Sequence, residues 1–318
     1  MRSSTPLADP GPNWIALPLS RSPRWFLPRE PPLHAKSGLS VYHPVTFRSR
    51  VGWETARVLA GRGTFSLRRG SSLLPREVWE AAGPLVPAQG GLSVARANHP
   101  GRFLALVFDQ GGTPVAFVKV ARDSAGSQAL VAERDALQRF GSLVSAPLFA
   151  PQVLSHSEGQ LVVEPVEWRA RSRPWRLPED VAFALGAFFR RSSDGEGRTG
   201  ASHGDFAPWN LLQTARGWEL VDWEDGRTGI PPYFDLFHYL VQSNSELRRP
   251  TKAAILDGLR LRGWVGRAIG AYAAGAETEA RESRHFLREY LRDSARKLDL
   301  DAPLRAARVR SKLLRRLS

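Results

Sequence analysis

The sequence predicts an α+β protein with two lobes, in which a small antiparallel sheet with one main helix precedes a larger, mainly helical part. Three observations support this prediction. Apolar residues alternate between 91 and 121 as in strands, apolar residues at helical spacing follow over 127–140, and the chain from Phe234 onward has mostly helical periodicity. The length of 318 residues is sufficient for two lobes of ordinary size.

The composition is that of an ordinary globular protein. Hydrophobic residues make up 42% and charged residues 24% of the chain, so neither disorder nor a fibre is indicated. The absence of cysteine excludes disulfides, thiolate metal sites and cysteine nucleophiles. No apolar run approaches the roughly 18 residues of a membrane span, and the first residues do not resemble a secretory signal, so we expect a cytoplasmic protein.

Residues 1–90 contain no chemical motif and are interpreted as an N-terminal extension of unknown role. They are rich in proline, tryptophan and arginine. Short extended pieces are predicted at 13–19 and 39–45, and a short helix at 53–60. The sequence leaves open whether this extension packs against the small lobe or extends an acceptor site.

Residues 91–166 are predicted to form the small lobe, and its last strand to end in a hinge. Alternation and β-branched residues indicate an antiparallel meander with a tight turn at 110–113. A helix follows over 127–140, for which Ser127 is the expected cap and Gly141 lies just past the end. The predicted strands span 91–97, 103–109, 114–121 and 159–166.

Residues 167–318 are predicted to form the larger lobe. A helix is expected at 178–191. Two short strands at 210–213 and 218–222 flank the turn at 214–217 and would form a hairpin.

Two charged residues lie in apolar surroundings. Lys119 is inside the apolar strand 114–121, where burial of an unpaired ammonium costs several kcal/mol. Glu133 falls on the face of the 127–140 helix that otherwise carries apolar residues toward the core. The two could pair, as a strand lysine and a helix glutamate do in nucleotide kinases, where the lysine holds the α and β phosphates. The alternative is a lysine that reaches the sheet edge and a glutamate that turns into solvent.

The segment HGDFAPWN at 203–210 concentrates polar groups that are typical of phosphoryl-transfer sites. The hairpin would bring Asn210 close to Asp222, giving one amide oxygen and one carboxylate, the hard ligands that Mg²⁺ prefers when it binds phosphates. Asp205 would then face the acceptor and take a hydroxyl proton. His203 is interpreted as a residue that braces the loop rather than as a base.

These motifs resemble those of the aminoglycoside phosphotransferase and choline kinase-like families, which share the protein-kinase-like fold. The resemblance rests on HGDFAPWN, on VDWEDG at 221–226, and on FVKV with the glutamate helix upstream. It covers residues 92–245 well and the C-terminal helices loosely. The segment 96–102 has no glycine-rich pattern, so ATP and another nucleoside triphosphate both stay open. The sequence has HGD in place of HRD and lacks an APE segment, which argues against a protein substrate.

The resemblance implies a role for each matching residue. It makes Asp205 the catalytic base, and Asn210 and Asp222 the magnesium ligands and members of the catalytic group. Lys119 becomes the phosphate lysine and Glu133 its partner. The segment Glu164 to Val166 becomes a hinge that meets the adenine, with Glu164 and Val166 as cofactor-binding positions. His203 and Asp235 become residues that support the catalytic loop. A helix N-cap is the alternative for Asp235.

The resemblance therefore implies an ATP-dependent O-phosphotransferase that moves the γ-phosphate of a magnesium nucleotide to a hydroxyl of a small molecule. A sugar, a glycan precursor and an aminoglycoside-like compound are the acceptors considered. The alternative is a catalytically silent kinase-like module that docks to an anionic partner or membrane surface. All five chemical positions are filled, which counts against the silent module.

The positive charge is concentrated at the C-terminus. The formal net charge is +14, and residues 247–318 contain 18 basic and 8 acidic residues. The tail from Arg305 could make a weak contact with an anionic membrane, or could be a solvated terminal helix. No nucleic-acid-binding motif is present, so no specific nucleic acid partner is expected. The arginine-rich helices favour a neutral or anionic acceptor over a polycationic one.

Overall fold

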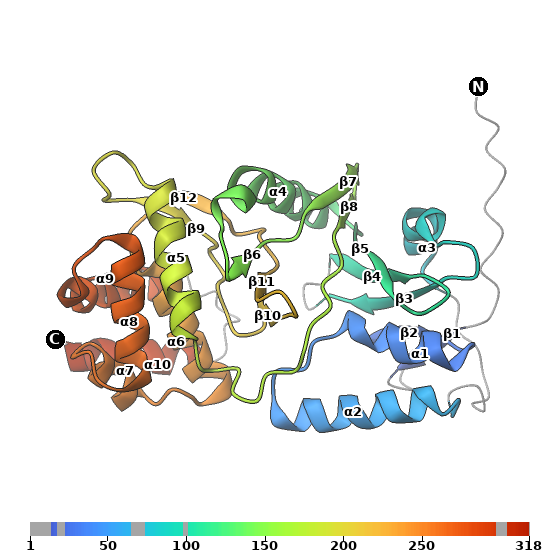
Figure 1. Cartoon of the computed structure of the whole chain (residues 1–318), viewed down its shortest axis with the longest axis horizontal. Helices are drawn as coiled ribbons and strands as arrows, with labels where there is room; N and C mark the ends of the chain where they lie inside the picture. Colours follow the sequence, from blue (N-terminus) through green and yellow to red (C-terminus); the bar gives the residue numbers. More distant parts are fainter. Residues whose placement is uncertain (1–13, 18–22, 65–73, 98–100, 297–303, 318) are drawn as a thin grey trace. The chain divides into compact units, whose positions relative to one another are not determined.

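The computed structural model describes most of the chain and divides it into two compact units (Figure 1). The first unit consists of residues 1–134 and 152–167, and the second of residues 135–151 and 168–318. The described residues are 14–17, 23–64, 74–97, 101–296 and 304–317.

The first unit contains a seven-stranded sheet in which every neighbouring pair is antiparallel. The predicted meander between 91 and 121 is confirmed and forms the middle of this sheet. The strands, in spatial order, are β1 (Trp14–Leu17), β2 (Trp25–Pro28), β3 (Gly91–Arg96), β4 (Arg102–Phe108), β5 (Pro114–Ala121), β8 (Gln160–Val163) and β7 (Val153–Ser157). Part of the N-terminal extension thus belongs to the sheet, because β2 pairs with β3 along Trp25↔Ala95 and Phe26↔Val94.

Helices of the N-terminal third follow the first two strands. They are α1 (Pro32–Gly38), α2 (Phe47–Gly61) and α3 (Arg76–Ala82), with 3-10 turns η1 (Leu39–Val41) and η2 (Gly83–Leu85). The helix predicted at 53–60 is confirmed, and it begins earlier because Thr46 caps it by accepting a hydrogen bond from the Ser49 amide. The extended piece predicted at 39–45 is wrong at its start, where η1 continues directly from α1 and the indole of Trp53 donates to the Leu39 carbonyl at 3.0 Å.

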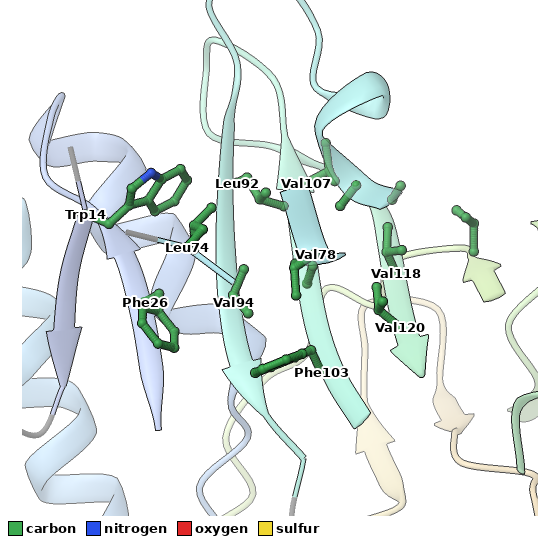
Figure 2. Packing of buried hydrophobic residues seen from close by; sticks show 14 residues of the cluster. Trp14, Phe26, Leu74, Val78, Leu92, Val94, Phe103, Val107, Val118 and Val120 are labelled. Atoms are coloured by element: carbon green, nitrogen blue, oxygen red, sulfur yellow. The ribbon is translucent and has the colours of Figure 1, made fainter. Parts of the chain in front are cut away.

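Alternate residues of the sheet face two different clusters of buried side chains. One face packs against α3, and its cluster includes Val78, Val107 and Val118 (Figure 2). The other face carries Phe108, whose ring lies 5.0 Å from that of His34 in α1. Because β5 alternates, Lys119 lies on the face opposite Val118.

The helix after β5 is α4 (Ser124–Phe140), which begins three residues before the predicted start. Its cap is Asp123, not Ser127, because the Asp123 Oδ1 atom accepts a hydrogen bond of 2.7 Å from the Gly126 amide. The predicted end at Gly141 is confirmed, and the 3-10 turn η3 (Gly141–Leu143) follows.

The second unit combines two small sheets with helices, which confirms the predicted α+β class. One sheet has the order β10 (Leu211–Gln213), β11 (Trp218–Leu220) and β6 (Leu148–Phe149), and the other pairs β9 (Gly200–Ser202) with β12 (Arg227–Ile230). The predicted hairpin is formed by β10 and β11. The helical elements are α5 (Glu179–Ser192), α6 (Phe234–Leu247), α7 (Lys252–Gly258), α8 (Gly263–Ala276), η4 (Ala280–Glu282), α9 (Ser283–Arg296) and α10 (Leu304–Leu317).

The C-terminal helix α10 is docked rather than free. It packs against α9 and α6, and Val309, Leu313 and Leu317 are buried there. The alternative of a solvated terminal helix is therefore wrong for the face of α10 that carries these three residues. The weak membrane contact is not supported either, because the apolar side of α10 is already covered by protein. Within the described ranges, no helix has the length and apolarity needed to cross a membrane.

Helices α5 and α8 approach each other closely through two glycines. A Cβ atom at Gly186 would lie 2.2 Å from the Tyr272 carbonyl oxygen, and one at Gly275 would lie 2.1 Å from the Phe183 carbonyl oxygen. Since both obstacles are backbone atoms, a side chain at either position would force the helices apart.

We expect Gly186→Ala to lower the free energy of unfolding by about 1–3 kcal/mol, the usual cost of overpacking. In an open helix position the same change stabilises by about 0.5–1 kcal/mol. Gly270→Ala in α8 provides the matched control, since nothing lies within 4 Å of its added Cβ atom. Urea unfolding of both variants gives the comparison, and equal stabilisation of the two would contradict the close packing.

Candidate active site

The predicted catalytic loop begins where β9 ends, in a backbone conformation that requires glycine. Gly204 has a φ of 85°, and a Cβ atom there would lie 2.2 Å from the Asp225 carbonyl oxygen. A left-handed conformation and a close backbone approach therefore both favour glycine at this position. Gly204 thus forms the turn of the backbone between His203 and Asp205.

Asp235 of α6 binds the start of this loop. Its Oδ1 atom accepts from the Ser202 hydroxyl at 2.7 Å and from the Gly204 amide at 3.1 Å. Its Oδ2 atom accepts from the His203 amide at 2.8 Å. The carboxylate is buried and satisfies two backbone donors of the loop. It does not act as the helix N-cap, because the N-cap position is Tyr233.

The carboxylate of Asp205 is held by two side chains. The Asn210 Nδ2 atom donates to Asp205 Oδ2 and to the Asp205 carbonyl oxygen, both at 2.8 Å. On the other side, His238 Nε2 lies 2.9 Å from Asp205 Oδ1. One third of the Asp205 side chain, 33%, is exposed. The arrangement fixes the carboxylate orientation while leaving it accessible to a ligand.

The β10–β11 hairpin brings the predicted magnesium ligands into register. The Val221 amide donates to the Asn210 carbonyl oxygen at 3.0 Å, so Asp222 follows immediately after a residue bonded to Asn210. Asp222 has a φ of 69°, a strained conformation for a residue with a side chain. Strain of this kind is common at functional sites.

The chemistry of this pair fits a magnesium ion. Because Nδ2 of Asn210 is engaged by Asp205, the amide oxygen is the atom left to act as a ligand. An amide oxygen and one carboxylate leave the other positions of an octahedral ion to water and phosphate oxygens, the usual situation for Mg²⁺. Over the part of the chain that the structure describes, no group of three or more His, Asp or Glu side chains could hold a metal.

His203 is buried beneath the loop. Its Nε2 atom lies 3.0 Å from the Val221 carbonyl oxygen, and its ring centroid lies 4.7 Å from that of Trp223. Burial lowers the pKa of His203, and this effect outweighs the opposing charges of Asp235 and Asp205. The neutral ring therefore connects the catalytic loop to the strand that leads to Asp222.

The lowered pKa of His203 predicts an acid-sensitive fold. An unfolded histidine titrates near pH 6.5, so below that pH the unfolded chain binds a proton that the folded chain does not. This contribution to stability is complete above pH 6.5 and is lost as the pH falls, by at most about 1.4 kcal/mol per pH unit. We expect urea unfolding between pH 7.5 and 5 to show a shallower loss for His203→Gln than for the unchanged protein.

An exposed histidine supplies the control for this pH series. His156→Gln should leave the slope unchanged, since His156 is an exposed residue of β7. A His203→Gln slope equal to that of the unchanged protein would remove this residue as a source of the acid sensitivity.

In the first unit, the predicted ion pair is confirmed. Lys119 Nζ lies 2.7 Å from both carboxylate oxygens of Glu133. Only 5% of Lys119 and 1% of Glu133 is exposed. The alternative, with the lysine at the sheet edge and the glutamate in solvent, is therefore wrong. A buried, paired lysine presents a fixed point charge, which suits phosphate oxygens.

The predicted hinge residues follow β8. Glu164 and Val166 are half-buried, and the Glu164 amide donates to the Gln152 carbonyl oxygen at 2.8 Å. Contact of this segment with adenine stays a prediction. The segment 96–102, which lacks a glycine-rich pattern, falls partly outside the described residues, which omit 98–100.

Sequence reasoning missed His238 and Tyr290. His238 lies three residues after Asp235 in α6, so both are on the face that meets the loop. Its Nδ1 atom lies 3.3 Å from the Tyr290 hydroxyl. Burial raises the pKa of Tyr290 to about 12, so its hydroxyl stays protonated and can donate to the ring. The spacing of Asp235 and His238 was a usable signal, whereas nothing in the sequence connects α6 with Tyr290 of α9.

Comparison with protein families finds a match in the second half of the chain. Residues 163–277, which contain the loop, the hairpin and α6, match the phosphotransferase enzyme family. The comparison with curated proteins found no match.

Several solved structures are similar at low identity. A protein from Thermobifida fusca YX-ER1 assigned as a fructosamine-3-kinase is 18% identical, with a TM-score of 0.47 over 76% of this chain and 95% of that chain. The ADP-bound aminoglycoside phosphotransferase APH(2'')-Ib is 11% identical, with a TM-score of 0.46 over 76% and 97%. The macrolide 2'-phosphotransferase MphH from Brachybacterium faecium is 10% identical, with a TM-score of 0.44 over 72% and 95%.

Proposed function

We propose that the protein is an ATP-dependent O-phosphotransferase acting on a small molecule, and the match of residues 163–277 to the phosphotransferase enzyme family supports this proposal. The observation that carries the proposal is the Asp205 carboxylate, which two side chains fix and which stays partly exposed. A structural carboxylate in a buried loop would not need to keep a third of its side chain open to solvent.

We assign the role of general base to Asp205. Its carboxylate accepts the proton of the acceptor hydroxyl as the oxygen forms its bond to the γ-phosphorus and the bond to the β-phosphate oxygen breaks. The hydrogen bonds from Asn210 and His238 prevent the carboxylate from rotating away. Asp235 contributes indirectly, since it fixes the two residues that precede Asp205.

The nucleotide and the metal are assigned to the remaining predicted residues. Lys119, fixed by Glu133, would bind a phosphate of the nucleotide, and Glu164 with Val166 would meet the base. Asn210 and Asp222 would hold Mg²⁺. When bound, the ion neutralises the charge that builds up on the phosphate oxygens.

For the acceptor, we propose a neutral or anionic hydroxyl compound such as a sugar or a glycan precursor. A pocket for a polycationic aminoglycoside needs several carboxylates. Helices α9 and α10 are instead rich in arginine, with 10 basic residues against 2 acidic ones over 283–296 and 304–317. An aminoglycoside-like acceptor is the less favoured choice on this ground.

A screen with ATP labelled in its γ-phosphate tests the proposal directly. The acceptors are sugars, glycan precursors, amino alcohols, nucleosides and aminoglycosides, each with Mg²⁺. Transfer of label to one class supports the proposal and identifies the acceptor. A rise in melting temperature with ATP and Mg²⁺ is expected in parallel, since a ligand that binds only the folded state stabilises it. The absence of both label transfer and a thermal shift under any nucleotide would favour the catalytically silent module.

His238 is expected to act as a positioning residue. His238→Leu removes the hydrogen bond to Asp205 and should lower kcat by about 10- to 100-fold, with little change in the KM for the nucleotide. His238→Gln can still donate from its amide and should retain more activity. Steady-state kinetics of both variants measure this, with His285→Gln as control. Equal kcat values for the unchanged protein and His238→Leu would exclude the role.

A further inference from the structure

The second unit contains a strongly basic cavity that is separate from the residues around Asp205. Its volume is about 310 Å³, and it is formed by the end of α6, the start of α7 and one side of α10. Five cationic side chains line it: Arg248, Lys252, Arg305, Arg308 and Lys312. Asn244 is the first residue of α6 after His238 that lines this cavity. At the helical rise of about 1.5 Å per residue, it lies roughly 9 Å from His238 along the helix axis.

The residues that the structure describes around this cavity do not balance its charge. Among the described residues, neither aspartate nor glutamate lines the cavity, and none of its five cations forms an ion pair. Other arginines of the same unit do pair, as in Arg267 with Glu179 and Arg216 with Glu219. Five like charges around one small volume repel one another, and an anion bound among them would relieve this repulsion.

The cationic groups are arranged to bind oxyanions. The guanidinium of Arg305 donates to the Asn244 carbonyl oxygen at 3.1 Å, which orients the rest of its fork. Arg305 and Lys252 are half-buried, while Arg308 and Lys312 are exposed at the entrance. Arginine forks bind phosphate oxygens in pairs, and lysine adds a mobile point charge. The volume is at the lower end of the range for small-molecule pockets.

We propose that this cavity binds a compact small molecule that carries two or more phosphate groups. The cavity shares no residue with the proposed nucleotide and magnesium positions or with the contacts of Asp205. It lies on α10, which also contributes Arg310, whose Nε atom donates to Ser294 of α9 at 3.1 Å. Occupancy would therefore hold α10 more firmly on the rest of the unit.

Inorganic pyrophosphate without divalent metal is the probe, and its affinity is measured by calorimetry with the full chain. Arg308→Gln/Lys312→Gln removes two exposed charges from the entrance, and we expect it to weaken binding at least about tenfold. Arg315→Gln/Arg316→Gln is the control, because it removes two exposed charges from the same helix outside the cavity. Equal losses in the two double variants would mean that affinity follows net charge alone, and the proposal would be wrong.

Two further measurements localise the binding. Pyrophosphate should protect amides of α10 from hydrogen exchange, and saturating ATP with Mg²⁺ should not displace it. Displacement by ATP, together with no effect of the entrance variant, would place the probe in a nucleotide site and overturn the proposal. These readouts do not depend on enzymatic activity, so the proposed kinase function can fail while this site is confirmed, or the reverse.

The remaining alternatives are also outcomes of the test. If single-stranded DNA or anionic vesicles bind and millimolar pyrophosphate does not, the proposal of a small ligand is wrong. The ligand is then a polyanionic polymer or surface. Asp299 and Asp301 belong to the stretch that is not described. If pyrophosphate binds only after Asp299→Asn/Asp301→Asn, the protein's own carboxylates occupy the cavity, and the proposal is wrong.

Discussion

Asp205→Asn is expected to lower kcat for phosphate transfer by about 10²- to 10⁴-fold, the contribution typical of a general base. Asparagine has nearly the shape of aspartate and can still accept a hydrogen bond, so the loop should keep its fold. It cannot take a proton at neutral pH. Because the change does not touch Lys119, the affinity for the nucleotide should stay within about threefold, a difference of well under 1 kcal/mol. Single-turnover transfer and nucleotide titration measure the two effects separately.

Asp225→Asn is the control for the loss of a negative charge near Asp205. Burial raises the pKa of Asp225, and the charge of Asp205 raises it further, so the two groups interact electrostatically. Asp225→Asn should nevertheless leave most of the turnover intact, since this residue has no proposed part in proton transfer. Turnover that survives in Asp205→Asn and disappears in Asp225→Asn would exchange the roles of these two residues.

Removing one member of the Lys119–Glu133 pair is expected to have the largest effect on stability. Glu133→Gln takes away the carboxylate charge that lies 2.7 Å from the buried ammonium, and the free energy of unfolding should fall by about 3–5 kcal/mol. Lys119→Met removes the other charge and leaves the carboxylate buried, with a loss of similar size. Both variants are measured by urea unfolding at neutral pH.

The double variant Lys119→Met/Glu133→Leu distinguishes pairing from packing. Apolar replacement of both partners of a buried ion pair is often neutral or stabilising, so we expect it to recover most of the stability. The proposed phosphate lysine is absent from this variant, so nucleotide binding should not return with stability. A double variant that is destabilised by the sum of the two single changes would show that the charges do not interact.

Local periodicity allowed much of the fold and site to be predicted. The strands over 91–121 and the hairpin of β10 and β11 are regular enough to be recognised in isolation. The Lys119–Glu133 pair was predictable for an energetic reason, since each charge is unfavourable on an apolar face unless the other is nearby. The closeness of Asn210 to the strand that leads to Asp222 was predictable for a geometric reason, because the hairpin pairs the two strands that adjoin these residues.

Other features depend on contacts that are distant in sequence. His238 meets Asp205 because α6 packs against the loop that Asp235 also binds, and Tyr290 meets His238 because α6 and α9 pack together. The start of α4 was predicted too late because Asp123 offers a cap one residue before the helix, ahead of a serine that could also have served. The docking of α10 could not be predicted from its charge, since its basic residues suggested a solvated face while its apolar face is buried.

The pairing of β2 with β3 has a consequence for how the protein reaches its fold. Trp25 meets Leu17 in β1 and Ala95 in β3, so β2 can pair locally with β1 but gains its second sheet partner only across the long stretch of chain between Trp25 and Ala95. Pairings between residues so far apart in sequence are slow to form, because closing a long loop costs entropy before the contact is gained. Until β3 is in place, the apolar side chains of Trp14 and Phe26 lack the cluster that later buries them, and apolar surface exposed in this way during folding is prone to aggregation.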